Sequence, residues 1–353
     1  MHVFVPRLLG LMAALLMLVA LPAAANFTPP KNLDPQNSGV NLDKSFTDEA
    51  WLVYTYDIDD QGEVINATIH SSNGVPTVEQ AVLGQINAMR FSPATRNGKP
   101  VKVSADPIFF TWILDKPREM TPTFSETYAL AWDEFKQGNY DGALDYAVQL
   151  KSMPGRNAYE EVKFQVLAAS IMSRWDDEAA ELQHLGRAVE LQELADKNDF
   201  INPYIESGQY LMILDRIHTL KLNGMMLADA SEVLAQIQSL APGTEVAQRS
   251  QARHAEVEAM YAGMIDVAIS AELTPIYREG PGSWKTGLSR TQFTISNVRG
   301  KILGVYLACD QGDVPLRYPS STAWVIPGGW TNCEVDVSGR AGTRFKLNQK
   351  NAG

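Results

Sequence analysis

The stretch that decides the first fold of the chain is Arg90-Phe91-Ser92-Pro93-Ala94-Thr95-Arg96-Asn97-Gly98-Lys99-Pro100-Val101. Asn97-Gly98 is a pair favoured in tight two-residue turns, because both central residues of such a turn need a positive φ. Pro93 has no backbone N–H, so we expect the preceding helix to end at Arg90-Phe91. We interpret these residues as determinants of backbone geometry.

Strands and a helix are predicted on both sides of this stretch. Trp51 to Ile58 and Val64 to Ser71 are β-rich runs, and Gly62 between them supplies the positive φ of a tight hairpin. Apolar residues at helical spacing predict a helix over Val78 to Met89. Val101 to Leu114 returns to strand character, interrupted at Asp106-Pro107. The predicted order is strand, strand, helix, strand.

These motifs together carry a family resemblance. Asp60-Gln61-Gly62-Glu63-Val64, then Ser71-Ser72-Asn73-Gly74, then the stretch from Arg90 to Val101 resembles the C-terminal domain of the TonB family, over residues about 40 to 116. The resemblance implies a β-β-α-β domain over 46–116. Its motif residues are then structural: Gly62, Val64, Arg90, Phe91, Pro93, Asn97, Gly98 and Pro100.

The resemblance also implies a way of binding. In the TonB family an edge strand of the domain pairs with an extended peptide of an outer-membrane receptor, so that main-chain hydrogen bonds supply affinity. By resemblance the last strand is that edge. We therefore expect a hypothetical peptide-binding edge strand that includes Phe109, Thr111 and Ile113.

The N-terminus predicts export. Arg7 precedes an apolar run from Leu8 to Leu21, and Pro22-Ala23-Ala24-Ala25 ends in the small-x-small pattern of a cleavage site. Residues 1–25 are thus a predicted signal peptide, which places the protein in the periplasm of a Gram-negative cell. The alternative is an uncleaved inner-membrane anchor, because Leu8 to Ala25 is 18 residues long and just reaches spanning length. Residues 26–45 are expected to be a linker.

From about residue 120 to 273 the pattern is helical. Gly138-Asn139-Tyr140 and its neighbours resemble part of a tetratricopeptide unit, and Trp175-Asp176-Asp177-Glu178-Ala179 echoes them some 35 residues later. The match is incomplete, so both a loose helical bundle and true repeats remain open. Gln248 to Ala271 is expected to be one long final helix.

Residues 275–353 predict a small all-β domain, because short β-rich runs alternate with glycine and proline. The fold class is therefore multidomain α+β. Cys309 and Cys333 are expected to form a disulfide in an oxidising compartment, with two buried thiols as the alternative. The aromatic residues of this part would fill its core or, if exposed, stack on a sugar or a partner; they are Trp284, Tyr306, Tyr318, Trp324 and Trp330.

Charge and motifs exclude several functions. With 41 acidic and 30 basic side chains the net charge is −11, which disfavours nucleic acid and anionic lipid as partners. His70, His184, His218 and His254 are scattered, and no metal, nucleotide or hydrolase motif is present. We expect no catalytic residues, no metal site and no cofactor, and hence no enzyme.

Two functions compete. The first is a periplasmic scaffold whose TonB-like domain and helices bind protein partners. The candidate partners include outer-membrane receptors and other envelope proteins. The second is a TonB-type energy transducer that couples the inner membrane to outer-membrane transport. A transducer needs a membrane anchor and a long linker, whereas only about 25 residues stand between the apolar run and the domain. Membrane contact is expected only if the N-terminal segment is retained.

Overall fold

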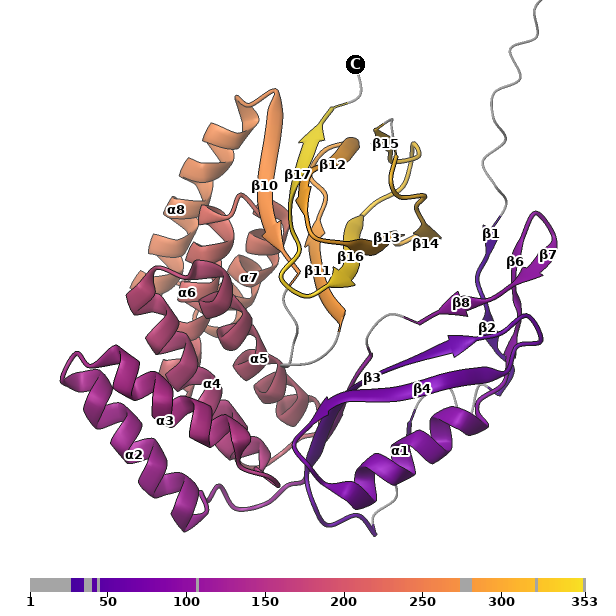
Figure 1. Ribbon diagram of the computed structural model, residues 1–353. Coiled ribbons are helices and arrows are strands. Elements are labelled where there is room, and N and C mark those ends of the chain that lie inside the picture. The colour runs from indigo at the N-terminus through magenta and orange to yellow at the C-terminus, as the bar shows by residue number, and fades with distance from the viewer. Residues whose placement is uncertain are drawn as a thin grey trace, which may run out of the picture.

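The computed structural model describes residues 27–34, 40–42, 45–105, 108–273, 281–320 and 323–351. Three regions follow one another along this part of the chain: a sheet with one helix, a set of packed helices, and a two-sheet β region (Figure 1). The predicted signal peptide, residues 1–25, and Asp106-Pro107 lie outside the described residues. Within the described ranges, no helix has the length and apolar character needed to cross a membrane.

The first region is built around β3 (Ala50–Ile58). β4 (Val64–Ser72) pairs with one edge of β3, and β8 (Val103–Ser104) and β9 (Ile108–Trp112) pair with the other edge. α1 (Pro76–Ala88) covers one face. Its apolar stripe packs on the sheet because the predicted helical spacing brings these residues to one side: Val78, Val82 and Ile86.

The stretch from Arg90 to Val101 forms the turn that the sequence predicts. β5 (Phe91–Ser92) leads into β6 (Ala94–Arg96) and β7 (Lys99–Val101), which form a hairpin. The φ angles of Asn97 and Gly98 are 52° and 75°. The expected helix end at Arg90-Phe91 is wrong, because α1 ends at Ala88 and Pro93 instead lies between β5 and β6.

The expected linker over 26–45 is partly folded. β1 (Phe27–Thr28) pairs with β6, and β2 (Lys31–Asn32) pairs with β5. Leu42 is buried against the core of the first region. The segment adds strands because β5 and β6 otherwise present unpaired N–H and C=O groups, which a neighbouring extended segment satisfies.

The helical region is confirmed, whereas a tetratricopeptide repeat is not. Asn139 and Asp177 each cap a helix start, which explains why the two motifs echo one another. The helices vary in length, from the 13 residues of α3 to the 20 residues of α5. In the described residues this region contains α2 (Pro122–Lys136), α3 (Tyr140–Ser152), α4 (Ala158–Met172), α5 (Glu178–Lys197), α6 (Ser207–Asn223), α7 (Leu227–Leu240) and α8 (Glu245–Ala262).

The expected helix over Gln248 to Ala271 is wrong in its second half. α8 ends at Ala262, and β10 (Asp266–Glu272) follows. Val267, Ile269 and Ala271 are buried and alternate with exposed residues, which is the two-residue period of a strand with one buried face. The β region therefore begins before residue 275, inside the range expected to be helical.

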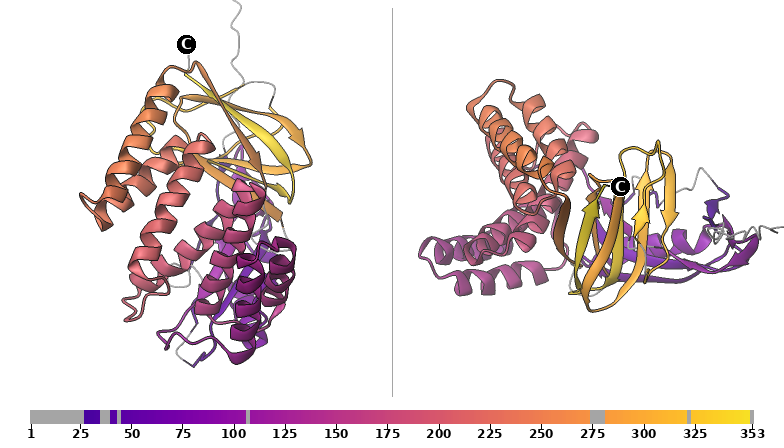
Figure 2. Two further views of the ribbon diagram at one scale, coloured as in Figure 1. Left: turned by 90° about the vertical axis from the view of Figure 1, so that its left-hand side faces the viewer. Right: turned by 90° about the horizontal axis from the view of Figure 1, so that it is seen from above.

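The last region is a sandwich of two four-stranded antiparallel sheets, with strand orders β10-β17-β12-β15 and β11-β16-β13-β14 (Figure 2). Cys309 at the end of β13 is bonded to Cys333 directly before β16, which confirms the expected disulfide. The remaining strands are β11 (Pro281–Gly287), β12 (Gln292–Arg299), β13 (Ile302–Cys309), β14 (Gly312–Pro315), β15 (Trp324–Val325), β16 (Glu334–Arg340) and β17 (Arg344–Lys350).

Gly62→Ala is expected to destabilise the first region much more than Gly98→Ala. Both glycines have a positive φ, 86° and 75°, which costs alanine about 1 kcal/mol or more. A Cβ at Gly62 would also lie 1.9 Å from the backbone oxygen of Phe91, whereas one at Gly98 meets nothing within 4 Å. Urea unfolding of both variants measures the difference, and equal losses would contradict this account of the turn.

Candidate functional site

The outer edge of β9 is the candidate protein-binding site. Its register with β3 runs without a shift from Ala50↔Trp112 to Tyr54↔Ile108, and no described strand pairs with its other side. The opposite edge of the sheet differs. β4 carries two register shifts, and Asn66 within it has a φ of 55°. Bulges of this kind hinder the addition of a further strand, so β9 is the more regular edge.

The register also tells which backbone groups of β9 point outward. Ala105 donates its N–H to the carbonyl of Tyr56, whereas Trp51 bonds to Asn73 on the β4 side. Even-numbered residues of β3 therefore bond toward β9. Because directly opposed residues of an antiparallel pair exchange both bonds or none, the N–H and C=O of Thr111 are directed to the outer edge.

The side chains of the predicted edge residues pack against the helices instead. The guanidinium of Arg187 on α5 lies 3.9 Å from the ring centroid of Phe109. Its Nη2 donates to Oγ1 of Thr111 over 3.4 Å. Ile113 is buried in the core that the helices share. A partner would thus meet the backbone of β9 rather than a row of exposed side chains.

The sheet is fixed to the helices by a buried polar junction. Glu49 accepts the N–H of Leu114 at 2.9 Å and the N–H of Ala158, in the first turn of α4, at 2.8 Å. Asn73 donates from Nδ2 to the carbonyls of Glu49 and Arg156 at 2.9 and 3.1 Å. The N–H of Gly155 donates to the carbonyl of Asn73 over 2.7 Å. In the sequence Asn73 stands out only as part of the TonB-like motif, and its contacts with Glu49 and Arg156 depend on the tertiary fold.

Arg156 completes the junction as a buried cation. Its Nη2 lies 2.9 Å from the carboxylate of Glu161, and both side chains are at least nine-tenths buried. Nη1 donates to the carbonyls of Leu150 and Met153, which end α3. The guanidinium also lies 5.8 Å from the ring centroid of Trp51 on β3. A charge satisfied on every side in this way stabilises one packing of the sheet on α3 and α4.

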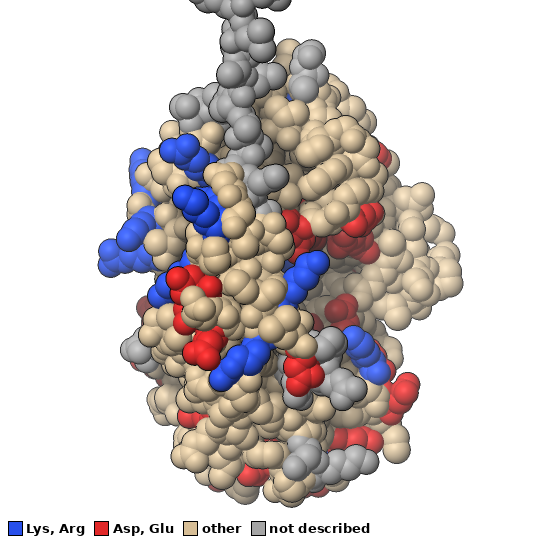
Figure 3. All heavy atoms as spheres, turned by 90° about the vertical axis from the view of Figure 1, so that its right-hand side faces the viewer, with Lys and Arg blue, Asp and Glu red and all other residues tan. Residues whose placement is uncertain are grey.

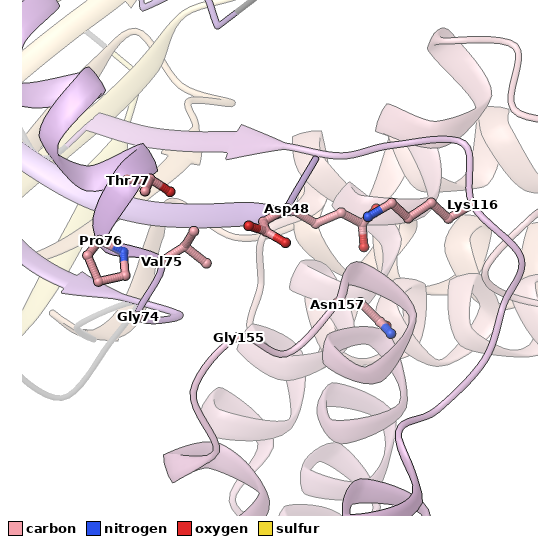
Figure 4. Close-up of a pocket in the computed structure, with 9 residues that line it drawn as sticks. Asp48, Gly74, Val75, Pro76, Thr77, Lys116, Gly155 and Asn157 are labelled. Carbon is pink, nitrogen blue, oxygen red and sulfur yellow. The ribbon is translucent and has the colours of Figure 1, made fainter. Parts of the chain in front are cut away.

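A cleft of about 400 Å³ opens beside this junction (Figure 4). It lies between the loop that leads into α1 and the loop that leads into α4. Its ionisable residues are the acids Asp48 and Glu49 and the cation Lys116, and Lys116 donates to the carbonyl of Thr47. No nucleophile and base are paired among the residues that line it, which are Asp48, Glu49, Gly74, Val75, Pro76, Thr77, Lys116, Gly155 and Asn157.

Two histidines that the sequence separates meet in the helical region. Nε2 of His218 on α6 lies 3.1 Å from Nδ1 of His254 on α8, and Nε2 of His254 lies 3.2 Å from Oγ of Ser231. Burial lowers the pKa of His218 to about 4, and the nearby His254 and Arg253 act in the same direction. In the described part of the chain no three metal-binding side chains gather. The pair was missed because α6 and α8 meet only in the tertiary fold.

The aromatic residues of the β region belong to its packing. Trp284 lies edge-on to Phe345 with centroids 5.3 Å apart, and Trp324 lies 5.2 Å from Phe293. Tyr318 and Trp330 are partly buried against the same core. These contacts favour the core interpretation over an exposed stacking surface.

Comparison with known families agrees with the geometry of the first region. Residues 49–114 match the family described as Gram-negative bacterial TonB protein C-terminal. The match begins at Glu49 and ends at Leu114, the two residues that a hydrogen bond joins. It covers less than a fifth of the 353 residues. No curated protein matches the chain. The matched region is a TonB-like domain, a type that interacts with proteins.

Glu49→Gln is expected to loosen the junction, because an amide offers only one acceptor oxygen for two buried N–H groups. An unsatisfied buried N–H costs about 1–3 kcal/mol, so at least one of the amides of Leu114 and Ala158 should exchange with solvent about tenfold faster or more. Asp48→Asn, at the exposed neighbouring acid, is the matched control. Unchanged exchange at both amides in Glu49→Gln would show that its carboxylate does not hold the junction.

The stability of the helical region is expected to fall as pH falls from 6.5 to 4. His218 stays neutral in the folded chain down to about pH 4, whereas the unfolded chain takes up a proton near pH 6.5. This difference costs about 2 kcal/mol between pH 7 and pH 5. Urea unfolding at the two pH values should show a smaller loss for His218→Gln than for the unaltered protein. Burial also lowers the pKa of His184 to about 4, so His184 contributes the same loss of stability in the variant and in the unaltered protein.

Proposed function

We propose that the protein is a non-catalytic periplasmic scaffold that binds an extended segment of a partner protein along the outer edge of β9. The observation that carries the proposal is this regular edge at the end of a TonB-like domain, with no described strand on its outer side. A partner strand would add main-chain hydrogen bonds to the outward groups of Thr111.

The helices supply a rigid support for that edge. On one face Arg187 contacts the ring of Phe109 and the hydroxyl of Thr111, and α1 covers the other face. A preorganised edge loses little conformational freedom on binding, so more of the hydrogen-bond energy remains as affinity. A second partner would contact the helices themselves, where Leu130 on α2 and Val148 on α3 are exposed.

The energy transducer is the second candidate, favoured by the family match itself. The N-terminal strands count against it. Because β1 begins at Phe27 and pairs with β6, only residues 22–26 lie between the apolar run and the folded domain. The six residue steps from Leu21 to Phe27 span at most about 22 Å, which is too short for an anchored domain to cross the periplasm. An anchored form would hold the domain beside the membrane.

Thr111→Pro should abolish peptide binding at this edge, since proline removes an outward N–H and its ring blocks a paired strand. Thr111→Val is the matched control, because it loses the contact with Arg187 but keeps the backbone N–H. The probe is a set of peptides selected from a random library displayed on phage against the unaltered protein. We expect at least a tenfold loss of affinity for Thr111→Pro and none for Thr111→Val, measured by fluorescence anisotropy.

Phe109→Pro tests the neighbouring outward position on the same strand. Circular dichroism must show that each variant keeps its fold. Peptides that bind both proline variants as tightly as the unaltered protein would assign the binding to another surface and overturn the edge-strand proposal. A library that yields no binder would also contradict it.

A further inference from the structure

A basic surface occupies the end of the first region that lies farthest along β3 from β9. Arg96 and Lys99 flank the Asn97-Gly98 turn, Lys102 follows β7, and Lys31 lies on the adjoining β2. All four side chains are exposed. We call these four residues the basic tip. Several Lys and Arg side chains gather toward the upper left of the face that contains this end, with acidic side chains directly below them and further charges of both signs across the rest of the face (Figure 3).

The basic tip stands out because the whole chain is acidic, with a net charge of −11. Lys102 pairs with Asp57 at 2.7 Å. In the described residues, no carboxylate lies within 4 Å of the ammonium of Lys31 or Lys99. The three-stranded sheet β1-β6-β7 carries Arg96 and Lys99 and no acidic residue. The acids Asp59, Asp60 and Glu63 of the β3–β4 turn lie at the same end, so the positive charge is confined to the side formed by β2, β6 and β7. An anionic surface would attract that side of the end.

The N-terminal apolar run stands only a few residues before β1, which lies at this end of the first region. Phe27 is opposite Arg96 in the register of β1 and β6, and the apolar run ends at Leu21. Six residue steps span at most about 22 Å, and cross-strand partners lie about 5 Å apart, so the end of a membrane-held run lies within about 27 Å of Arg96. If the run is removed before Asn26, the new α-amino group adds a positive charge beside Phe27. Both forms of the chain thus favour an anionic surface at the same place.

We propose that the basic tip binds the anionic phospholipid headgroups of the membrane surface. Polybasic segments next to a bilayer gain affinity from each Lys or Arg, about fivefold per charge. The exposed Leu33, next to the strand that carries Lys31, adds an apolar contact at the interface. This surface is separate from the β9 edge, so lipid binding and peptide binding can be tested independently of each other.

The first experiment uses the chain that begins at Asn26, recovered from the periplasm, because the apolar run would bind vesicles by itself. The probe is sedimentation with vesicles of phosphatidylcholine, with or without phosphatidylglycerol, at low and high salt. We expect binding only to the anionic vesicles, weakened by salt. Lys31→Glu/Lys99→Glu should lower it at least about 25-fold, the loss of two favourable charges. Lys301→Glu/Lys350→Glu, with the same change in net charge on the sandwich, is the control.

If the chain retains the apolar run, the whole protein in nanodiscs replaces the vesicles, and acetylation of lysines followed by mass spectrometry is the readout. Lys31 and Lys99 should be protected in anionic and not in neutral bilayers, whereas Lys301 should react equally in both. Equal losses for the two double variants, or equal protection in neutral lipid, would overturn the proposal. Binding to polyglutamate without binding to anionic vesicles would also overturn it and assign the basic tip to an acidic protein segment.

Discussion

The carboxylate of Glu49 is the contact on which the arrangement of the first two regions depends. It accepts one N–H from the end of the TonB-like domain and one from the first turn of α4. A buried carboxylate loses its hydration, so it is tolerated here only because these N–H groups take the place of water. The side chain of Glu49, the first residue of the matched segment, thereby bonds to Leu114, the last residue of that segment, and also joins the segment to α4. Asn73 and Arg156 add neutral and charged bonds around the same point.

This junction gives the sheet two buried faces. α1 covers one face, and the helical region covers the other, where Trp51 is fully buried and Arg187 contacts Phe109. Ala50 to Tyr54 accordingly read as a continuous apolar run rather than an alternation, as strands covered on both faces do.

Local signals predicted local structure well. Asn97-Gly98 and Gly62 adopt the positive φ that their turns need, and Cys309 is bonded to Cys333. β3, β4 and α1 lie within a few residues of their predicted ranges. Each of these depends on residues close in sequence or on a single possible pair of cysteines.

The failures share a physical cause. The sequence predicts helix where β10 lies, because Val267 fits the helical spacing of α8 as well as the alternation of a strand. Only the pairing of β10 with β17 decides between the two. The strands at Phe27 and Lys31 form because β6 and β5 offer them partners more than 60 residues away. Arg187 and the pair of His218 and His254 are likewise brought to their places by tertiary packing. Sequence spacing carries no record of such partners.

The two proposed surfaces lie at opposite ends of one strand, and this has a geometric consequence. β9 pairs with Ala50 to Tyr54, whereas β8, which leads from the basic tip, pairs with Asp57 and Ile58. At about 3.3 Å per residue, the middle of the β9 edge therefore lies more than about 15 Å along the strand from that end of the sheet. Headgroup contact at the tip would leave the β9 edge above the lipid and open to a partner. Because Glu49 and Arg156 hold the helices rigidly on the same sheet, the helices would share that orientation.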